Sequence, residues 1–340
     1  MNGQPAIRWG LLYTGDSLTM AGYLRLAELA ERAGADSLWS SELSREAFVP
    51  LAAAAGAGRR LRLGTAVATY ARTPMHVEAA AMAMAELTGG NFVLGLGTAP
   101  PAWNEAWHGL KVDRPVLRMR EFIGAIRAMW TARPGQPASY AGELIEVRDY
   151  LRFMPAPYLS VPIYLAAVGP QMLRLAGEVA DGLLANVLNT PAYFRDVVAP
   201  NLAAGRARSA DPDRPFEVGT LKVCSVHADR AVALDRARAT VAFYATLPYF
   251  DVVLDPAGFA AEKDQARAAL AKGDLASAAA AVSDEMVTAV ALAGTPDDVR
   301  GQLRAFEGLI DLVVLRCATV GLDDATIAQA HDDMIGAFAV

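Results

Sequence analysis

The chain has 340 residues, a formal net charge of −6, 54% hydrophobic residues and 20% charged residues. A chain of this composition can bury a large core, and its acidic balance without a basic cluster argues against a nucleic-acid partner. Since no apolar run reaches the ~20 residues of a membrane span and no signal-peptide pattern begins the chain, we expect a soluble, cytoplasmic protein.

Short apolar segments alternate with amphipathic segments along the chain. The predicted strands are 6–13, 36–41, 60–69, 91–97, 161–167, 182–187, 216–226 and 309–316. The predicted helices are 19–34, 74–88, 114–131, 170–180, 191–208, 229–245 and 296–307. Several strands are apolar nearly throughout, which is typical of parallel strands covered on both faces. Thr295 before Pro296, and Thr73 before Pro74, have the pattern of a capped helix start.

This order is compatible with a closed barrel or with a long doubly wound sheet. The turn at 14–17 lacks the glycine fingerprint of a dinucleotide-binding sheet, so we predict one TIM-type (β/α)8 barrel over residues 1–340. Insertions are expected after the fourth strand (98–113), as a small hairpin within 135–160, and before the last barrel unit (246–284). Such insertions usually form the mouth of the site or an oligomer contact.

Function in a barrel lies at the carboxyl ends of the strands. There Val168-Gly169-Pro170 leads directly into a predicted helix. Free N–H groups at a helix start bind phosphate, and the glycine permits close approach; an ordinary tight turn is the alternative reading. Gly95-Leu96-Gly97-Thr98, at the end of another strand, is a similar but weaker signal of a phosphate site, because glycine pairs at strand ends are common.

Two charged residues also follow strands. Glu42 could bind a substrate or a ring nitrogen, or it could be a solvated carboxylate or an ion-pair partner of Arg45 or Arg72. Arg316 could hold an anionic substrate group, or it could form a structural ion pair across the barrel mouth.

The four histidines lack metal-ligand spacing, and we expect no metal site. His108 lies in the aromatic insertion and is the one histidine considered as an acid–base group. Both cysteines, Cys224 and Cys317, are expected to be buried thiols. Because no catalytic triad or carboxylate pair is evident, a mechanism carried by a cofactor is favoured.

Aromatic residues gather where the mouth of the barrel is expected. Trp103 and Trp107 lie in the insertion, and Tyr13 and Tyr70 follow strands. They suggest an apolar or ring-shaped substrate, although aromatic residues at such positions are also common in packing.

Two long segments are similar to those of a known family. LRLGTAVATYARTPMHVEAAAMAMAELTGGNFVLGLGT and IYLAAVGPQMLRLAGEVADGLLAN resemble the luciferase-like flavin and deazaflavin oxidoreductases, over about residues 5–320. Within that superfamily the chain looks most like the actinobacterial branch that uses coenzyme F420, on SELSREAFVPLAAAAGAGRRLRLGT and the later Met119-Arg120-Glu121.

The resemblance implies roles for particular residues. Ala66-Val67 would form a non-proline cis peptide supporting the cofactor ring, beside which Glu42 would lie. Gly97 and Thr98 would line the cofactor channel, and Val168, Gly169 and Asn186 would hold its phosphate. The neighbouring strand-end residues Thr65 and Ala167 are expected to join them. Relatives are often dimers, so a homodimer is expected.

The chain departs from the family pattern at two places. Leu43 stands where many relatives have a histidine, so a proton donor must come from Glu42, Asp16, His108 or Tyr70. Ala99-Pro100-Pro101 replaces the glycine and acid of deazaflavin sugar-phosphate dehydrogenases, which puts that substrate in doubt.

Three functions follow from this reading. The first is hydride transfer between coenzyme F420 and a small organic substrate, with Glu42 and His108 as candidate catalytic residues. Tyr13, Asp16, Tyr70, Trp103, Trp107 and Arg316 are then the candidate substrate contacts. The second is a monooxygenase using reduced FMN and oxygen. The third is a catalytically silent barrel that serves as a partner subunit.

Overall fold

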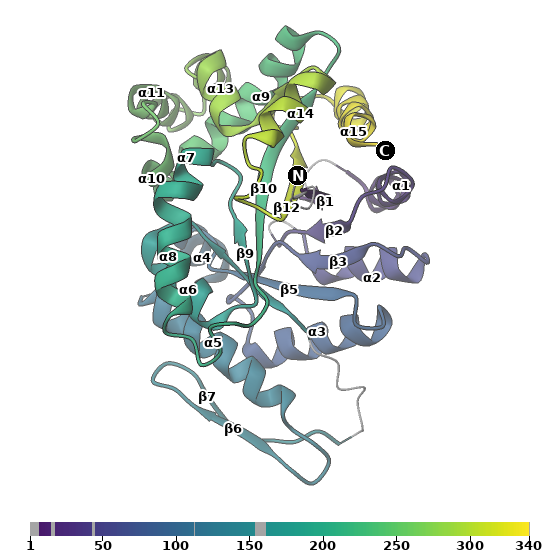
Figure 1. The fold of residues 1–340 in the computed structure, drawn as a ribbon, viewed down its shortest axis with the longest axis vertical. Coiled ribbons are helices and arrows are strands. Elements are labelled where there is room, and N and C mark those ends of the chain that lie inside the picture. The colour runs from purple at the N-terminus through teal and green to yellow at the C-terminus, as the bar shows by residue number, and fades with distance from the viewer. Residues whose placement is uncertain (1–6, 15–17, 43–44, 112, 154–160, 340) are drawn as a thin grey trace, which may run out of the picture.

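The computed structural model describes residues 7–14, 18–42, 45–111, 113–153 and 161–339. Parallel strands form a closed eight-stranded barrel in the order β12-β1-β2-β3-β5-β8-β9-β10, and the pairing of β10 with β9 closes the ring (Figure 1). The bounds are β1 Arg8–Tyr13, β2 Ser37–Ser40, β3 Arg62–Thr65, β5 Phe92–Gly97, β8 Ile163–Ala167, β9 Gly182–Ala185, β10 Glu217–Val226 and β12 Leu312–Cys317. The predicted barrel is confirmed.

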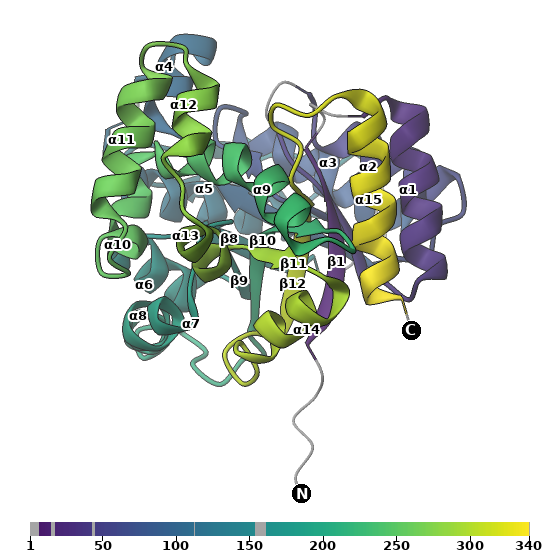
Figure 2. The same ribbon diagram turned by 90° about the horizontal axis from the view of Figure 1, so that it is seen from above.

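Helices surround this ring and bury the outer faces of its strands. The helices before β9 are α1 Met20–Arg32, α2 Phe48–Gly56, α3 Pro74–Leu87, α4 Pro101–His108, α5 Pro115–Trp130 and α6 Pro170–Val179. Those between β9 and β10 are α7 Pro191–Tyr193, a π-helical turn at Phe194–Val198 and α8 Ala199–Arg206. Those after β10 are α9 Arg230–Ala245, α10 Asp251–Leu254, α11 Ala260–Leu270, α12 Leu275–Ala280, α13 Asp284–Val290, α14 Pro296–Arg304 and α15 Asp324–Phe338. Figure 2 shows α15 beside α1, where Asp332 accepts two hydrogen bonds from Arg25.

The predicted helix starts are present. The Thr295 side chain accepts a hydrogen bond from Asp298 N, while the Asp298 carboxylate accepts one from Thr295 N, so both halves of a capping box are formed. The Thr73 hydroxyl accepts from His76 N in the same way. These caps satisfy N–H groups that the first helical turn leaves without a backbone acceptor.

The predicted hairpin is β6 Ala138–Ala141 paired with β7 Glu146–Tyr150, beside α5 and outside the barrel (Figure 1). The Glu121 carboxylate of α5 accepts hydrogen bonds from N–H groups of Glu143, Leu144 and Ile145 in its turn. After the hairpin, Arg152 pairs with Glu78 of α3, whose side chain is fully buried. The hairpin is therefore tied to the helix layer by two buried carboxylates.

Five elements differ from the sequence-based expectation. The predicted strand 60–69 is broken into β3 and a short β4, Ala68–Thr69. The segment 98–113 contains α4, and α2 and α15 were not predicted. A three-residue strand, β11 Leu292–Gly294, pairs with the end of β10. Within the described part of the chain, no helix is long and apolar enough to cross a membrane.

Charged residues close the amino end of the barrel. Arg62, at the start of β3, pairs with Asp36 and Glu217, and Arg8 pairs with the same two carboxylates. Burial raises the pKa of the Glu217 carboxyl, but hydrogen bonds and charges from Arg62 and Arg8 bring that pKa below its usual value. This end of the barrel is thus occupied by a structural ion network.

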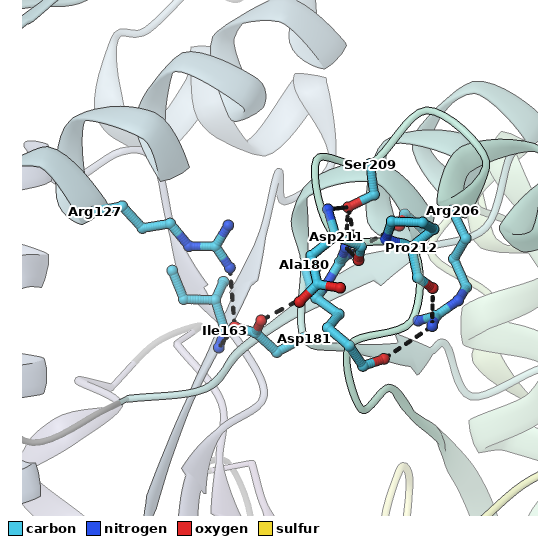
Figure 3. A network of polar contacts seen from close by, with 10 residues as sticks. Arg127, Ile163, Ala180, Asp181, Arg206, Ser209, Asp211 and Pro212 are labelled. Carbon is cyan, nitrogen blue, oxygen red and sulfur yellow. Dashed lines mark hydrogen bonds and ion pairs between the residues drawn. The ribbon is translucent and has the colours of Figure 1, made fainter.

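A second polar network joins β8 and β9 at the same end (Figure 3). Asp181 accepts hydrogen bonds from Ile163 N at 2.9 Å and from Arg127 at 3.0 Å. Arg214 donates to the carbonyl oxygen of Ala180, and Arg206 donates to that of Pro212. Because both ion networks occupy the amino ends of the strands, we expect the active site at the carboxyl ends.

Candidate active site

A cavity of about 1060 Å³ opens at the carboxyl ends of the barrel strands. Twelve of the candidate residues line it, namely Glu42, Ala66, Val67, Tyr70, Gly97, Thr98, Trp103, Ala167, Val168, Gly169, Asn186 and Arg316. These residues come from strands on every side of the ring and from α4. The barrel therefore brings most of the predicted site into one space large enough for a cofactor and a small substrate.

One wall of the cavity is the break between β3 and β4. The Ala66–Val67 peptide bond is cis, so this prediction is confirmed. Ala66 N donates to Ser40 O at 2.8 Å, and Glu42 N donates to Val67 O at 3.2 Å, which fixes both sides of the break to β2 and its following loop. Gly97 lies against Val67 from β5. Because these three residues have small side chains or none, the wall presents mainly backbone and methyl groups.

Thr65 supports this wall and does not line the cavity. Its side chain is fully buried, and its hydroxyl donates to Gly95 O at 2.7 Å. A Cβ at Gly95 would lie 1.8 Å from Thr65 O, so β3 and β5 approach more closely here than any side chain would allow. Thr65 therefore holds the two strands together directly below the break.

Glu42 is fully engaged by its neighbours. Oε1 accepts from Arg72 Nε at 2.7 Å and Oε2 accepts from Thr69 N at 2.9 Å. Arg72 also donates to Glu46 at 2.6 Å. Of the two readings from sequence, the structure contains the ion pair with Arg72, and the carboxylate also faces the cavity.

The start of α6 forms another wall. Gly169 is the N-cap of α6 and offers no side chain to the first helical N–H groups. A Cβ added at Gly169 would meet no atom within 4 Å, so open space lies in front of the helix. Val168 O accepts a hydrogen bond from the Tyr193 hydroxyl at 2.5 Å, which anchors the turn. This arrangement suits an anionic group of a ligand, because free N–H groups and the helix dipole point at it.

Asn186 follows β9 on the neighbouring side of the cavity. Its Oδ1 accepts from Val187 N at 2.7 Å, and its side chain also hydrogen-bonds to Tyr249. Asn186 lines the cavity together with Ala167 and Gly169.

Besides Thr65, four candidate residues are not part of the described lining. Tyr13 is buried, and its hydroxyl donates to Leu18 O at 3.1 Å and accepts from Arg45 at 3.1 Å. Trp107 is 56% exposed and stacks on Trp103 with ring centroids 4.8 Å apart. His108 ends α4 and is exposed away from the cavity. Asp16, like Leu43, lies outside the described residues.

Tyr70 does line the cavity and is 7% exposed. Burial raises the pKa of its hydroxyl to about 12, although the positive charge of Arg118 opposes this rise. Tyr70 therefore keeps its proton at neutral pH.

Several lining residues were missed by the sequence analysis. Phe243 and Tyr244 at the end of α9, with Leu247 and Tyr249 beyond it, form part of the cavity wall. The ring centroids of Phe243 and Trp103 are 6.4 Å apart, so the end of α9 meets α4 at the cavity wall. The run Phe243-Tyr244 followed by Tyr249-Phe250 was a signal, since its aromatic residues adjoin a predicted insertion.

Comparisons with known proteins agree with this architecture. A family model described as luciferase-like monooxygenase matches residues 8–311. A 5,10-methylenetetrahydromethanopterin reductase of Archaeoglobus fulgidus is 34% identical over 286 residues, covering 80% of this chain and 82% of the reductase. A putative coenzyme F420-dependent oxidoreductase of Mycobacterium tuberculosis is 28% identical over 305 residues, covering 84% and 87%.

The solved structure of the coenzyme F420-dependent tetrahydromethanopterin reductase of Methanopyrus kandleri is similar in fold. It aligns with a TM-score of 0.79 at 22% sequence identity, over 98% of this chain and 100% of the reductase. The fold and the extent of the family match define an oxidoreductase barrel. The chain belongs to the luciferase-like monooxygenase family.

Proposed function

We propose that the protein is an F420-dependent oxidoreductase that transfers a hydride between the deazaflavin and a small organic substrate. The observation that carries this proposal is one cavity that has both a wall of small residues at Ala66, Val67 and Gly97 and an open helix start at Gly169. The first suits a planar ring system, and the second suits a phosphate group.

Sequence similarity supports F420 over FMN. One relative, the putative oxidoreductase of M. tuberculosis, is named for coenzyme F420. The Archaeoglobus relative, at higher identity, is named as a reductase and not as a monooxygenase.

The residues present fit such a cofactor. Val67 and Gly97 leave a surface without bulky groups, on which a ring could lie. The N–H groups at the start of α6 and the Asn186 amide would hold the phosphate, with Thr98 and Ala167 between the two regions. When bound, the deazaflavin supplies hydride transfer at its C5 carbon.

In this proposal the protein's own residues position the cofactor and substrate and supply a proton donor. Trp103, Phe243 and Tyr244 contribute aromatic rings to the cavity wall. Exclusion of water by such a wall would strengthen electrostatic interactions with a bound substrate. Glu42 holds Arg72 and Thr69 and thereby fixes the loop beside the ring wall. Tyr70 offers a protonated hydroxyl at the cavity surface, whereas His108 is exposed and is not a lining residue.

The test is to titrate the purified protein with F420 and, separately, with FMN. Quenching of tryptophan fluorescence measures the binding of each cofactor. We expect saturable binding of F420 at one molecule per chain and much weaker binding of FMN. Tighter binding of FMN would favour the alternative, a monooxygenase using reduced FMN. Binding of neither cofactor would contradict both enzyme assignments and favour a catalytically silent barrel.

A further inference from the structure

Arg316 is a buried cation in the wall of the cavity. It lies near the end of β12, is 4% exposed and lines the cavity. The strand register explains its direction, because Val314 pairs with Leu221 and Arg316 with Val223 on β10. Leu221 faces the cavity, so Arg316, two residues beyond its partner Val314, is on the same inner face.

Arg316 forms no ion pair with any carboxylate in the ranges that the structure describes. Of the two acids among the lining residues, Glu42 is held by Arg72, and Asp324 is exposed at the start of α15. The structural ion pair considered from the sequence is thus not found among the described residues. Burying an uncompensated guanidinium is costly, so a charge partner supplied by a ligand would account for its presence.

The donors of Arg316 are only partly used. Nε donates to the Tyr244 hydroxyl at 3.0 Å, and Nη1 donates to Cys317 O at 2.7 Å. A guanidinium has five N–H donors, and among the described residues Nη2 has no acceptor. The Tyr244 ring also lies 5.2 Å from the guanidinium carbon, and this hydroxyl, which accepts from Arg316, donates to no described acceptor.

Position separates this pair from the proposed cofactor walls. In the ring β12-β1-β2-β3-β5-β8-β9-β10, strand β12 lies opposite β5, which carries Gly97. Tyr244 comes from the end of α9 and not from the strands that carry the cis peptide or the phosphate turn. A ligand group at Arg316 would therefore lie across the cavity from the ring wall.

We infer that Arg316 and Tyr244 bind an anionic oxygen group, a carboxylate or a phosphate, of the substrate. This assignment rests on the proposed function for the identity of the ligand as substrate, and it goes beyond that function by naming the substrate class. Arg316 supplies the positive charge and guanidinium N–H donors. Tyr244 holds the guanidinium in place and adds one hydroxyl donor.

The test compares benzoate with its neutral analogue benzamide, each titrated into the protein with and without F420. Benzoate suits the aromatic walls and presents a carboxylate. We expect benzoate to bind about tenfold more tightly than benzamide, as a charged hydrogen-bonded contact typically gives. In Arg316→Gln this preference falls to about one, and Tyr244→Phe reduces it partly. A separate titration with inorganic phosphate distinguishes the two oxyanions, and a preference for either one supports the assignment.

The matched control is Arg236→Gln. Arg236 is a partly buried arginine on α9, with its side chain 14% exposed, that pairs with Asp333 at 3.5 Å and does not line the cavity. Its variant should keep the full preference, and thermal unfolding of both variants identifies loss of fold. If Arg316→Gln unfolds, Arg316→Lys replaces it, and the preference should then be reduced.

Three outcomes overturn the inference: equal binding of benzoate and benzamide, an unchanged preference in a folded Arg316 variant, or competition between benzoate and F420. Failure of the proposed function looks different. In that case F420 does not bind, while the preference for benzoate and its loss in the Arg316 variant remain.

Discussion

A Cβ atom at Gly97 would lie 2.4 Å from Cγ2 of Val67, so the strand β5 and the cis peptide are in contact without room for one methyl group. Substitution Gly97→Ala should displace Val67 and destabilise the protein by about 1–3 kcal/mol, the usual cost of overpacking. It should also weaken F420 binding, because the ring wall moves. Thermal unfolding and cofactor titration measure the two effects.

The double variant Gly97→Ala, Val67→Ala provides the control. Removing Cγ2 of Val67 makes space for the new methyl group, so part of both losses should be recovered. Equal or larger losses in the double variant would mean that the clash with Val67 is not the cause.

The substitution Gly169→Ala should lower the affinity for F420 without changing the stability of the fold. Gly169 has φ −78°, which alanine adopts readily, and an added Cβ would meet no protein atom within 4 Å. The free energy of unfolding should therefore stay within about 0.5 kcal/mol of the parent. The methyl group would occupy the space before α6, so F420 affinity should fall by about 1 kcal/mol, comparable to one lost hydrogen bond.

Gly336→Ala on α15 is the matched control for Gly169→Ala. Its Cβ also meets nothing within 4 Å, but Gly336 lies outside the cavity. Its cofactor affinity should equal that of the parent. An unchanged affinity in Gly169→Ala as well would contradict a ligand phosphate at this turn.

Glu42→Gln tests whether Glu42 positions the site or reacts in it. The substitution weakens the bond from Arg72 and leaves that partly buried cation with Glu46 as its one remaining ion-pair partner among the described residues, so both stability and cofactor affinity should fall, each by about 1–2 kcal/mol. The pH dependence of turnover should keep its shape if Glu42 only positions Arg72 and Thr69. Loss of the basic or acidic limb of that profile would instead make Glu42 a proton donor or acceptor.

Glu46→Gln is a useful comparison for this variant. Glu46 shares Arg72 with Glu42 but does not line the cavity. We expect a smaller stability loss and no change in cofactor affinity.

Lys222 should make stability depend on pH. Its ammonium is completely buried on β10, donates to Asn189 O and Val290 O, and has no described carboxylate partner; burial lowers its pKa to about 7. Between about pH 7 and 10.5 the unfolded chain binds a proton that the folded chain does not, so the free energy of unfolding rises with pH across this window.

Replacing Lys222 by Met should remove this contribution, which is at most about 1.4 kcal/mol per pH unit. Denaturant unfolding at pH 6, 7, 8 and 9 measures it. The exposed Lys272 serves as control, and Lys272→Met should retain the parent slope. A parental slope in Lys222→Met would show that other groups cause the dependence.

The sequence predicted the barrel because eight apolar segments separated by helical periods leave few alternatives. It did not predict α2, where Phe48–Gly56 is nearly all apolar and contains Pro50, so the helix has no polar face to give a period. The strand β11 has three residues, too few for any pattern. The break at Ala66–Val67 came from family resemblance, since two small apolar residues carry no signal of a cis bond.

The sequence predicted those parts of the site that a single contiguous backbone segment forms. Val168-Gly169 and Gly97-Thr98 lie at the cavity as their strand ends suggested. Contacts made by distant segments were not predictable. Tyr244 contacts Arg316 because the end of α9 lies at the carboxyl ends of the barrel strands. The Tyr13 hydroxyl donates to Leu18 O, and Tyr13 does not line the cavity.

The central claim is that the deazaflavin ring lies against Ala66, Val67 and Gly97, with its phosphate at the start of α6. A crystal structure of the protein with F420 tests this most directly. The account predicts electron density for the ring along that wall and for the phosphate within hydrogen-bond distance of the N–H groups following Gly169. Density for the phosphate at Arg316, or a ring on the β10 and β12 side of the cavity, would contradict it.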